Sequence, residues 1–211
     1  PNAMYLPMAA LPDFHRKLEL TPGQQHEYGA DLSFLGAGYP NRRAAFRTLL
    51  RRNFKIWGSD WEGDALLASR VQRGGVRISA EESVLVYNAT KININLHSSL
   101  NADTLVSGGD FVNPRTFELA AMEAFQLVDR RSLMPDLFRM DGEQAELAVF
   151  SSPEEMETAI DFYLAHPEAR QDVTRRGRER ILAEHTYQHR MNAMLGFIQS
   201  RLPNWPRVRA Q

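Results

Sequence analysis

The chain has 211 residues, a formal net charge of −1 and no cysteine. This length suits either one large domain or a domain with appendages, and it allows a substantial core. The absence of cysteine excludes disulfides and thiolate metal sites, and the near-zero net charge gives no electrostatic argument for a nucleic acid partner. Hydrophobic residues make up 43% of the sequence and charged residues 24%, as in ordinary globular proteins.

The first 30 residues predict a lead-in rather than a domain. Pro1-Asn-Ala ahead of Met4 is interpreted as an expression-tag remnant, and the prolines and glycine that follow favour a linker. The start shows neither the basic region nor the long apolar region of a signal peptide. No run approaches the roughly 18 apolar residues of a membrane span. We therefore expect a cytoplasmic protein without a membrane span.

From residue 31 onward, predicted strands alternate with predicted helices, which favours an α/β fold with a mostly parallel sheet covered by helices on both faces. A Ser-x-x-Glu capping box at Ser79 and caps at Asn41 and Ser152 mark helix starts. The strands are expected at 31–35, 54–58, 76–78, 91–96, 126–129 and 147–150. The helices are expected at 42–52, 65–72, 79–87, from about 115, 153–164, 167–185 and 187–202.

The first predicted strand runs into a Gly36-x-Gly38 turn, which would let a ligand approach the backbone. No third glycine opens the next helix, so the dinucleotide fingerprint is incomplete, and a ligand loop and a plain tight turn remain equal alternatives. Arg42 and Arg43 lie on the first turn of that helix, where the helix dipole disfavours cations. A bound phosphate would explain them, although a solvated side chain is the simpler alternative for at least one.

The most informative stretch follows the predicted strand at 91–96. A polar loop leads into a helix with Arg115 and Glu118 on one side of its first turn, and a helix N-terminus favours anions. One alternative is a local ion pair between these two residues. The other assigns Arg115 to a phosphate, through its planar fork of donors, and Glu118 to a ribose diol. Asp110, eight residues before Glu118, would then face a sugar.

The basic clusters and a histidine pair are interpreted as structural rather than functional features. The basic clusters 51–52, 175–176 and 178–180 are interrupted by acids and lack interleaved aromatic residues, so they indicate solvated helix faces rather than a nucleic acid site. His185 and His189 are four apart, but no third ligand is evident, and we expect no metal there.

Several segments of the chain occur together in a fixed order. They are Phe34-Leu-Gly36, Arg42, Tyr87, Lys91-Ile-Asn-Ile-Asn95, Arg115-Thr-Phe-Glu118, Asp129-Arg-Arg131, Glu154-Glu-Met156, Phe162-Tyr-Leu164, Pro167-Glu-Ala-Arg170 and Glu184-His-Thr-Tyr187. This series resembles the C-terminal half of CgeB-like glycosyltransferases of the spore maturation protein type, and more broadly the donor-binding domain of the two-domain GT-B fold. The match covers nearly everything from about residue 31 to 198.

The resemblance implies a three-layer α/β/α, Rossmann-like nucleotide-sugar-binding domain at residues 31–186, with a C-terminal helix and tail at 187–211. Arg42 and Lys91 fall where similar proteins place basic residues near the diphosphate, and Asp110 takes the position of a possible catalytic acid. Glu123 stands where such proteins usually carry glycine. The implied donor-binding residues are Gly36, Gly38, Arg42, Lys91, Asn113, Arg115, Thr116 and Glu118.

The expected function is transfer of a sugar from a nucleoside diphosphate, UDP or GDP, to an unknown acceptor by a bacterial enzyme. No cofactor or metal is required, because basic residues and helix N-termini can hold the diphosphate. An N-terminal acceptor-binding domain is the missing partner, and the chain alone is expected to be inactive. The alternatives are a nucleotide-sugar epimerase or hydrolase on the same fold, or a non-enzymatic domain that binds a protein through residues 187–202 and the Trp205 tail.

Overall fold

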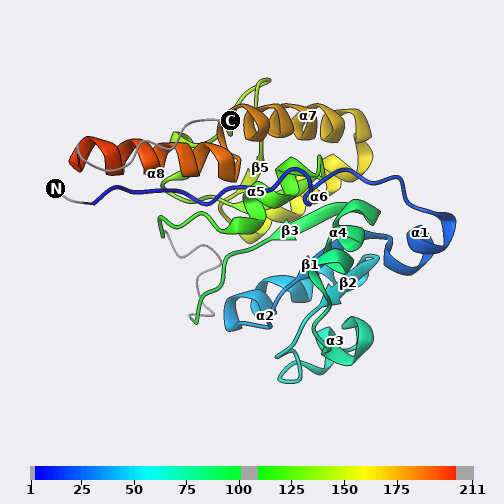
Figure 1. The fold of residues 1–211 in the computed structure, drawn as a ribbon. Helices are drawn as coiled ribbons and strands as arrows, with labels where there is room; N and C mark the ends of the chain where they lie inside the picture. Colours follow the sequence, from blue (N-terminus) through cyan, green and yellow to red (C-terminus); the bar gives the residue numbers. More distant parts are fainter. Residues whose placement is uncertain (1–2, 101–108, 203–211) are drawn as a thin grey trace.

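The computed structural model describes residues 3–100 and 109–202 and consists of a five-stranded sheet between two layers of helices (Figure 1). The strand order is β2-β1-β3-β4-β5, and every neighbouring pair is parallel. The predicted three-layer α/β/α fold is therefore confirmed. The strands are β1 (Ala30–Leu35), β2 (Phe54–Trp57), β3 (Thr90–Asn95), β4 (Gln126–Asp129) and β5 (Ala148–Phe150).

The strand order creates a switch point between β1 and β3. From β1 the chain moves outward to β2 on one side, and from β3 it moves outward to β4 and β5 on the other. Because all strands are parallel, their carboxyl ends meet at one edge, where the loops after β1 and β3 diverge. Open parallel sheets bind ligands in the crevice that this divergence leaves.

Helices cover both faces of the sheet. The 3₁₀ segments are η1 (Arg47–Arg51), η2 (Gln72–Gly75) and η3 (Met134–Asp136). The α-helices are α1 (Pro22–Tyr28), α2 (Pro40–Phe46), α3 (Ala65–Ala68), α4 (Ala80–Ala89), α5 (Pro114–Ala121), α6 (Pro153–Ala165), α7 (Pro167–Glu184) and α8 (Tyr187–Arg201).

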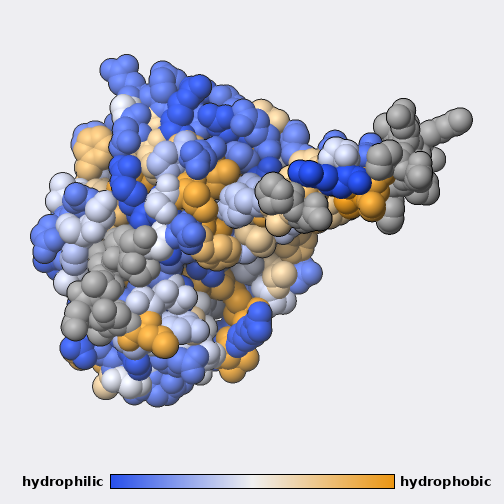
Figure 2. All heavy atoms as spheres, turned by 90° about the vertical axis from the view of Figure 1, so that its left-hand side faces the viewer, coloured by the Kyte–Doolittle hydropathy of each residue, from blue (hydrophilic) through white to orange (hydrophobic). Residues whose placement is uncertain are grey.

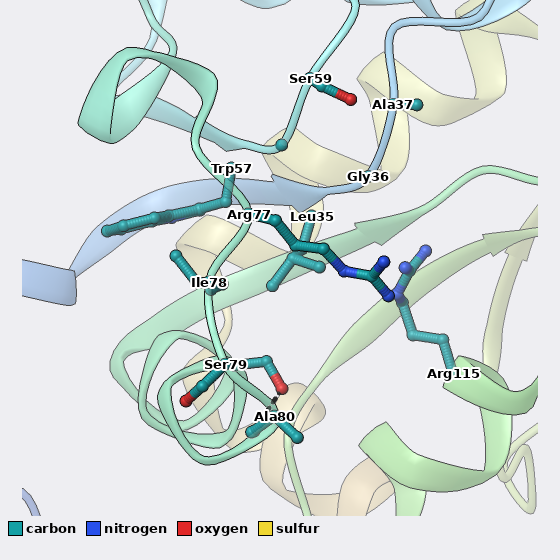
Figure 3. Close-up of a pocket in the computed structure, with 12 residues that line it drawn as sticks. Leu35, Gly36, Ala37, Trp57, Ser59, Arg77, Ile78, Ser79, Ala80 and Arg115 are labelled. Carbon is teal, nitrogen blue, oxygen red and sulfur yellow. Dashed lines mark hydrogen bonds between the residues drawn. The ribbon is translucent and has the colours of Figure 1, made fainter.

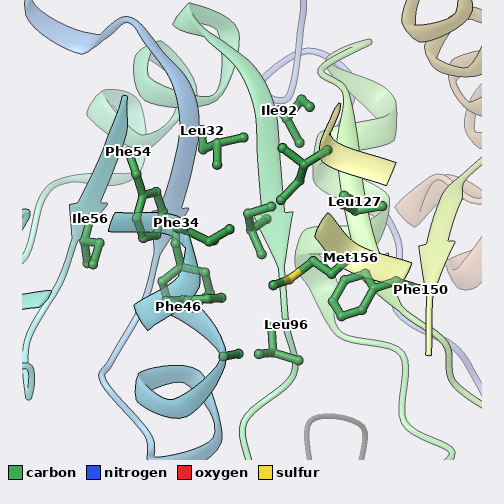
Figure 4. Packing of buried hydrophobic residues seen from close by; sticks show 14 of the residues in the cluster. Leu32, Phe34, Phe46, Phe54, Ile56, Ile92, Leu96, Leu127, Phe150 and Met156 are labelled. Atoms are coloured by element: carbon green, nitrogen blue, oxygen red, sulfur yellow. The ribbon is translucent and has the colours of Figure 1, made fainter. Parts of the chain in front are cut away.

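The largest apolar cluster lies between the sheet and the layer that contains α2 and α6 (Figure 4). Phe34 of β1 packs against Phe46 of α2 with ring centroids 4.8 Å apart, and Met156 of α6 is fully buried in the same cluster. On the opposite face, Phe117 of α5 and Ile181 of α7 pack with Val128 of β4. Each such fully buried side chain contributes roughly 1.5–3 kcal/mol. This packing fixes the strand ends that carry the site.

The strand expected at residues 76–78 is absent from the structure. The edge position next to β2 is taken instead by Val71, which forms a parallel bridge with Ile56. Arg73 and Gly74 then adopt left-handed conformations, with φ of 51° and 60°. These two residues turn the chain away from the sheet, so residues 76–78 cross above its carboxyl edge in extended form before α4 begins.

The lead-in is more structured than the sequence indicates. Residues 22–28 form α1, which begins with a capping box between Thr21 and Gln24. A threonine followed three residues later by glutamine is a helix start signal that the sequence contains. Ahead of it, a segment that we call the lead-in strap (residues 3–20) lies along the domain. Ala10 of this strap is fully buried and pairs with Thr186 in an isolated parallel bridge. The expected domain boundary at residue 31 stays a prediction.

Candidate functional site

Arg42 connects the two loops that diverge at the switch point. Its Nε and Nη2 donate to the Leu96 carbonyl, at 3.0 and 2.8 Å, and its Nη1 donates to the Ala37 carbonyl at 3.0 Å. The guanidinium lies 4.9 Å from the ring centroid of Phe34, and only 7% of the residue is exposed. Arg42 is therefore a buried cation bonded to neutral carbonyl oxygens.

The buried charge of Arg42 carries a cost. Burial, and after it the nearby positive charge of Arg115, lower the pKa of Arg42 to about 10, while Asp129 opposes the shift. A cation whose charged form is disfavoured by its surroundings is stabilised by an anion placed beside it. Such an anion would lie next to Arg42 and Arg115.

Arg115 and Arg77 converge from opposite sides of a cavity. Arg115 projects from the first turn of α5 and donates through Nε to the Tyr87 hydroxyl at 2.9 Å. Arg77 comes from the segment between η2 and α4, and Figure 3 shows its guanidinium directed toward that of Arg115. Within residues 3–100 and 109–202, neither of them nor Arg42 forms an ion pair with a carboxylate. The local ion pair between Arg115 and Glu118 that remained an alternative is not formed.

Two adjoining cavities share Arg115. The first has a volume of about 640 Å³ and is lined by the ends of β1 and β2, including Gly36, and by residues 77–80 of the crossing segment. The second has a volume of about 390 Å³ and is lined by Arg42, His97, Asn113 and Glu118 among others. Viewed from the side where these loops lie, the surface combines hydrophilic atoms with a band of hydrophobic ones (Figure 2).

The N-terminus of α5 is fixed by a polar network. Asn113 is its N-cap, and its Oδ1 accepts from the Thr116 N–H at 3.0 Å. Asn95 of β3 is fully buried and donates to Thr116 Oγ1 at 3.1 Å and to Gln126 Oε1 at 3.0 Å. These bonds use the side chains of Asn113 and Thr116 internally. Thr116 is fully buried, so it supports the helix start and does not face either cavity.

His97 fastens the same helix start to β4. The Asn113 N–H donates to His97 Nε2 at 3.0 Å, so the ring carries its proton on Nδ1, which donates to Asp129 Oδ1 at 2.6 Å. Asp129 also accepts from the His97 N–H at 2.8 Å, and its other oxygen lies 3.5 Å from Arg131 Nη1. All three side chains are buried. Asp129 is thus engaged by His97 and Arg131 rather than by Arg42 or Arg115.

The structure brings together five of the predicted donor-binding residues and separates three. Gly36, Arg42, Asn113, Arg115 and Glu118 line the two cavities. Gly38 is buried where an added Cβ would lie 2.2 Å from the Asp60 carbonyl oxygen, so its role is close backbone packing. Thr116 is the buried helix cap described above.

Lys91 is placed far from the other predicted site residues. It lies near the amino end of β3, at the opposite edge of the sheet, and its Nζ is 2.7 Å from Asp31 Oδ1. About 13 Å of strand separates it from the carboxyl end of β3, at ~3.3 Å per residue. Its side chain is 57% exposed, whereas the other residues of β3 are buried. The predicted contact with a diphosphate bound at the carboxyl edge is therefore not supported by this geometry.

Asp110 lies on the loop before α5 and is exposed. It lines neither of the two cavities. Its neighbour Phe111, 52% exposed, lines the second cavity instead. The proposed catalytic role of Asp110 stays a prediction.

Three residues of the site were not predicted. Arg77 was assigned to a strand, and no sequence pattern distinguishes it from a surface arginine. His97 and Asp129 each follow or end an apolar strand, and polar residues at the carboxyl ends of neighbouring parallel strands meet at one edge. Applied to His97 and Asp129, this rule would have predicted that their side chains lie close together.

Other expectations concern chemistry elsewhere in the molecule. His185 Nε2 bonds the Leu137 carbonyl, and His189 belongs to the capping box of α8, so both have protein partners. In the part of the chain that the structure describes, no cluster of three or more metal-ligating side chains occurs. No described helix is both long enough and apolar enough to cross a membrane. The Trp205 tail lies outside the described residues.

Comparison with known proteins identifies the family. The family model described as "Glycosyl transferase-like" matches residues 42–196, so the chain belongs to this family. Spore protein CgeB of Bacillus subtilis (strain 168) is 27% identical over 180 residues, which cover 81% of this chain and 53% of that protein. The chain thus spans about half the length of this relative. The resemblance predicted from the sequence is confirmed.

Solved structures show the same fold. A glycosyltransferase from Rickettsia africae ESF-5 superposes with a TM-score of 0.68 at 11% identity, covering 93% of this chain and 56% of that one. The C-terminal domain of a glycosyl transferase group 1 family protein from Francisella tularensis has a TM-score of 0.59 at 12% identity, covering 84% of this chain and 98% of that domain. The fold is that of one Rossmann-like domain of a GT-B glycosyltransferase, in agreement with the prediction of its C-terminal half.

Proposed function

We propose that this member of the glycosyl transferase-like family is the donor-binding domain of an enzyme that transfers a sugar from a nucleoside diphosphate. The observation that carries the proposal is the convergence of Arg42, Arg77 and Arg115 at the switch point, where no carboxylate of the described residues neutralises them. Arginine binds phosphate through a planar fork of donors. A diphosphate between these side chains would neutralise the buried charge.

The two cavities fit the remaining parts of such a donor. The cavity of about 640 Å³ at the ends of β1 and β2 has apolar walls from Leu35 and Ile78 together with exposed backbone at Gly36. This composition suits a nucleobase, which needs flat apolar contact and a few hydrogen bonds. The second cavity contains Glu118, whose carboxylate can accept hydrogen bonds from the two ribose hydroxyls.

The cations also suit the chemistry of the transfer. As the glycosidic bond breaks, negative charge develops on the departing nucleoside diphosphate. Fixed positive charges at that position stabilise the transition state more than the ground state. Arg42 is rigidly held by its three hydrogen bonds, so it costs little reorganisation during the reaction. No residue of the described chain is assigned as a general base, and the acceptor is expected on a separate N-terminal domain.

A binding experiment tests the proposal on the 211-residue chain. UDP, GDP and their sugar conjugates are added in turn, and the melting temperature is measured together with affinity by calorimetry. A nucleotide that binds only the folded chain raises the melting temperature by mass action. We expect a rise with one base series and a much smaller one for Glu118→Ala. Glu179→Ala on the exposed face of α7 is the matched control. No response of the wild type to any of these nucleotides would contradict the proposal.

A further inference from the structure

The lead-in strap brings a histidine to the carboxylate of Glu118. His15 Nε2 lies 3.9 Å from Glu118 Oε1, and the two side chains are 15% and 29% exposed. No other side chain within residues 3–100 and 109–202 pairs with the Glu118 carboxylate. The strap therefore supplies the polar neighbour of a residue that lines the second cavity.

The position of the strap is fixed at several points. The Ala10 N–H donates to the His185 carbonyl and the Ala10 carbonyl accepts from the Tyr187 N–H, both at 3.0 Å. Further along, the Leu18 N–H donates to Asn88 Oδ1 of α4 at 2.9 Å. Phe14 packs on the apolar cluster that includes residues of α4 and α5. His15 lies in the sequence between Ala10 and Leu18, and both of these residues are hydrogen-bonded to the domain. These contacts fix the position of His15.

The orientation of the imidazole is also determined. The Leu11 N–H donates to His15 Nδ1 at 3.1 Å, which places the ring proton on Nε2, the atom that faces Glu118. Burial lowers the pKa of His15, and the Glu118 carboxylate partly opposes this by raising it. The ring is therefore neutral near pH 7 and presents an N–H donor to the carboxylate.

We propose that His15 is a positioning residue for Glu118, which it orients so that the carboxylate accepts the hydroxyls of a bound ribose. The separation of 3.9 Å exceeds a hydrogen bond. In this proposal the bond forms when the Glu118 side chain turns to accept the ribose hydroxyls. A glutamate side chain loses rotamer freedom on binding, and a donor already aimed at it reduces that loss. This inference rests on the proposed function and extends the site to the lead-in strap.

A matched pair of variants tests it through ribose recognition. The amide nitrogen of His15→Gln can replace Nε2, whereas that of His15→Asn is too short to reach Glu118. The affinities for UDP and GDP are compared with those for their 2′-deoxy counterparts. We expect the preference for the ribose form to fall by about fivefold in His15→Asn and to be retained in His15→Gln. The fivefold decrease is smaller than the effect of losing a whole hydrogen bond to a charged group. His26→Gln on α1 is the control and should leave the preference unchanged.

The outcomes separate this inference from the proposed function. If Glu118→Gln abolishes the ribose preference and His15→Asn leaves it intact, the positioning role is overturned while nucleotide binding stands. If the wild type binds no nucleotide, the proposed function fails. A merely structural role of His15 would weaken ribose and deoxyribose forms equally, and equal weakening would also overturn the inference.

A measurement without ligand tests the contact itself. Imidazole NMR of the wild type should show the tautomer with its proton on Nε2. In Glu118→Gln the negative charge that raises the pKa of His15 is gone, so that pKa should fall further. A proton on Nδ1, or a pKa of His15 that Glu118→Gln leaves unchanged, would overturn the contact whatever the nucleotide results.

Discussion

The two edges of the parallel sheet carry similar residues in opposite electrostatic states. At the amino edge, Lys91 pairs with Asp31 and Lys17 pairs with Glu123, each at 2.7 Å, around a cavity of about 220 Å³. At the carboxyl edge, Arg42, Arg77 and Arg115 face two larger cavities without a carboxylate partner among the residues that the structure describes. The difference shows that a cation alone does not mark a site. What marks it is a cation whose charge the protein leaves without an opposite charge.

The same distinction separates the carboxyl edge from the basic clusters in the sequence. Arg52 pairs with Asp161 at 2.6 Å, and Arg180 pairs with Glu146 at 3.0 Å. Arg175 pairs with Glu179 at 3.0 Å on the exposed face of α7. The interpretation as a solvated helix face fits Arg175, whose side chain is 54% exposed, whereas Arg52 and Arg180 are only 13% and 19% exposed within their ion pairs. The arginines of the site stand singly or beside one other arginine in the sequence, so clustering is a poor guide to function here.

The largest expected effect tests Asp129, a buried carboxylate at the carboxyl end of β4. Asp129→Ala removes a carboxylate that accepts a hydrogen bond from His97 Nδ1 and pairs with the buried Arg131. Both groups then lose that interaction. We expect a loss of about 3 kcal/mol in the free energy of unfolding, as for breaking a buried charged network. Urea unfolding measures it. Asp172→Ala, on the exposed face of α7, should change stability by less than about 0.5 kcal/mol. Equal effects of the two substitutions would contradict the assignment.

The second prediction tests the unpaired cations themselves. Arg115→Gln keeps a side chain that can bond the Tyr87 hydroxyl but removes the charge. We expect the affinity for the nucleoside diphosphate that binds to fall by roughly 10- to 100-fold, because hydrogen bonds to charged groups contribute about 1.5–3 kcal/mol. Arg175→Gln on α7 is the matched control and should bind as the wild type does. The affinities are measured by calorimetry. A wild-type affinity in Arg115→Gln would mean that this cation does not face the ligand.

Much of the fold follows from local patterns, whereas the site depends on distant contacts. β4 occurs at the predicted residues and β2 ends one residue before the predicted Gly58, because apolar runs bounded by turn residues are strong local signals. The strand expected at 76–78 is wrong, since Val71 occupies the sheet edge and left-handed residues redirect the chain. Arg115 and Glu118 were predicted from one helix turn. Arg77 and His15 reach the site through a loop and a strap whose paths no local pattern records.

The third prediction concerns the backbone at the end of α5, near the amino edge. Glu123 has a φ of 55°, a left-handed conformation that costs a non-glycine residue roughly 1 kcal/mol. The Ala124 N–H bonds the Leu119 carbonyl and the Glu123 N–H bonds the Ala120 carbonyl, which is the helix ending that favours glycine. We therefore expect Glu123→Gly to raise the free energy of unfolding by about 0.5–1 kcal/mol. This net figure already includes the small cost of losing the exposed ion pair with Lys17.

A control separates the backbone effect from the charge effect. Glu123→Ala also removes the pair with Lys17 but keeps a Cβ in the left-handed conformation, so it should not stabilise the chain. If both substitutions raise the melting temperature equally, the gain comes from removing the carboxylate and not from relieving the backbone. Neither substitution should change nucleotide affinity, because Glu123 lines only the cavity at the amino edge.

The smallest expected effect sharpens the comparison most directly. Lys91→Gln removes a cation that family resemblance places near the diphosphate but that the structure pairs with Asp31 at the amino edge. We expect nucleotide affinity within about twofold of the wild type, and a stability change of about 0.5 kcal/mol or less, as for other exposed ion pairs. Asp31→Asn should lower stability by a similar amount, because it breaks the same pair. If Lys91→Gln instead weakens binding as strongly as Arg115→Gln, charge pairing would no longer distinguish the two edges, and the donor would have to extend across the sheet.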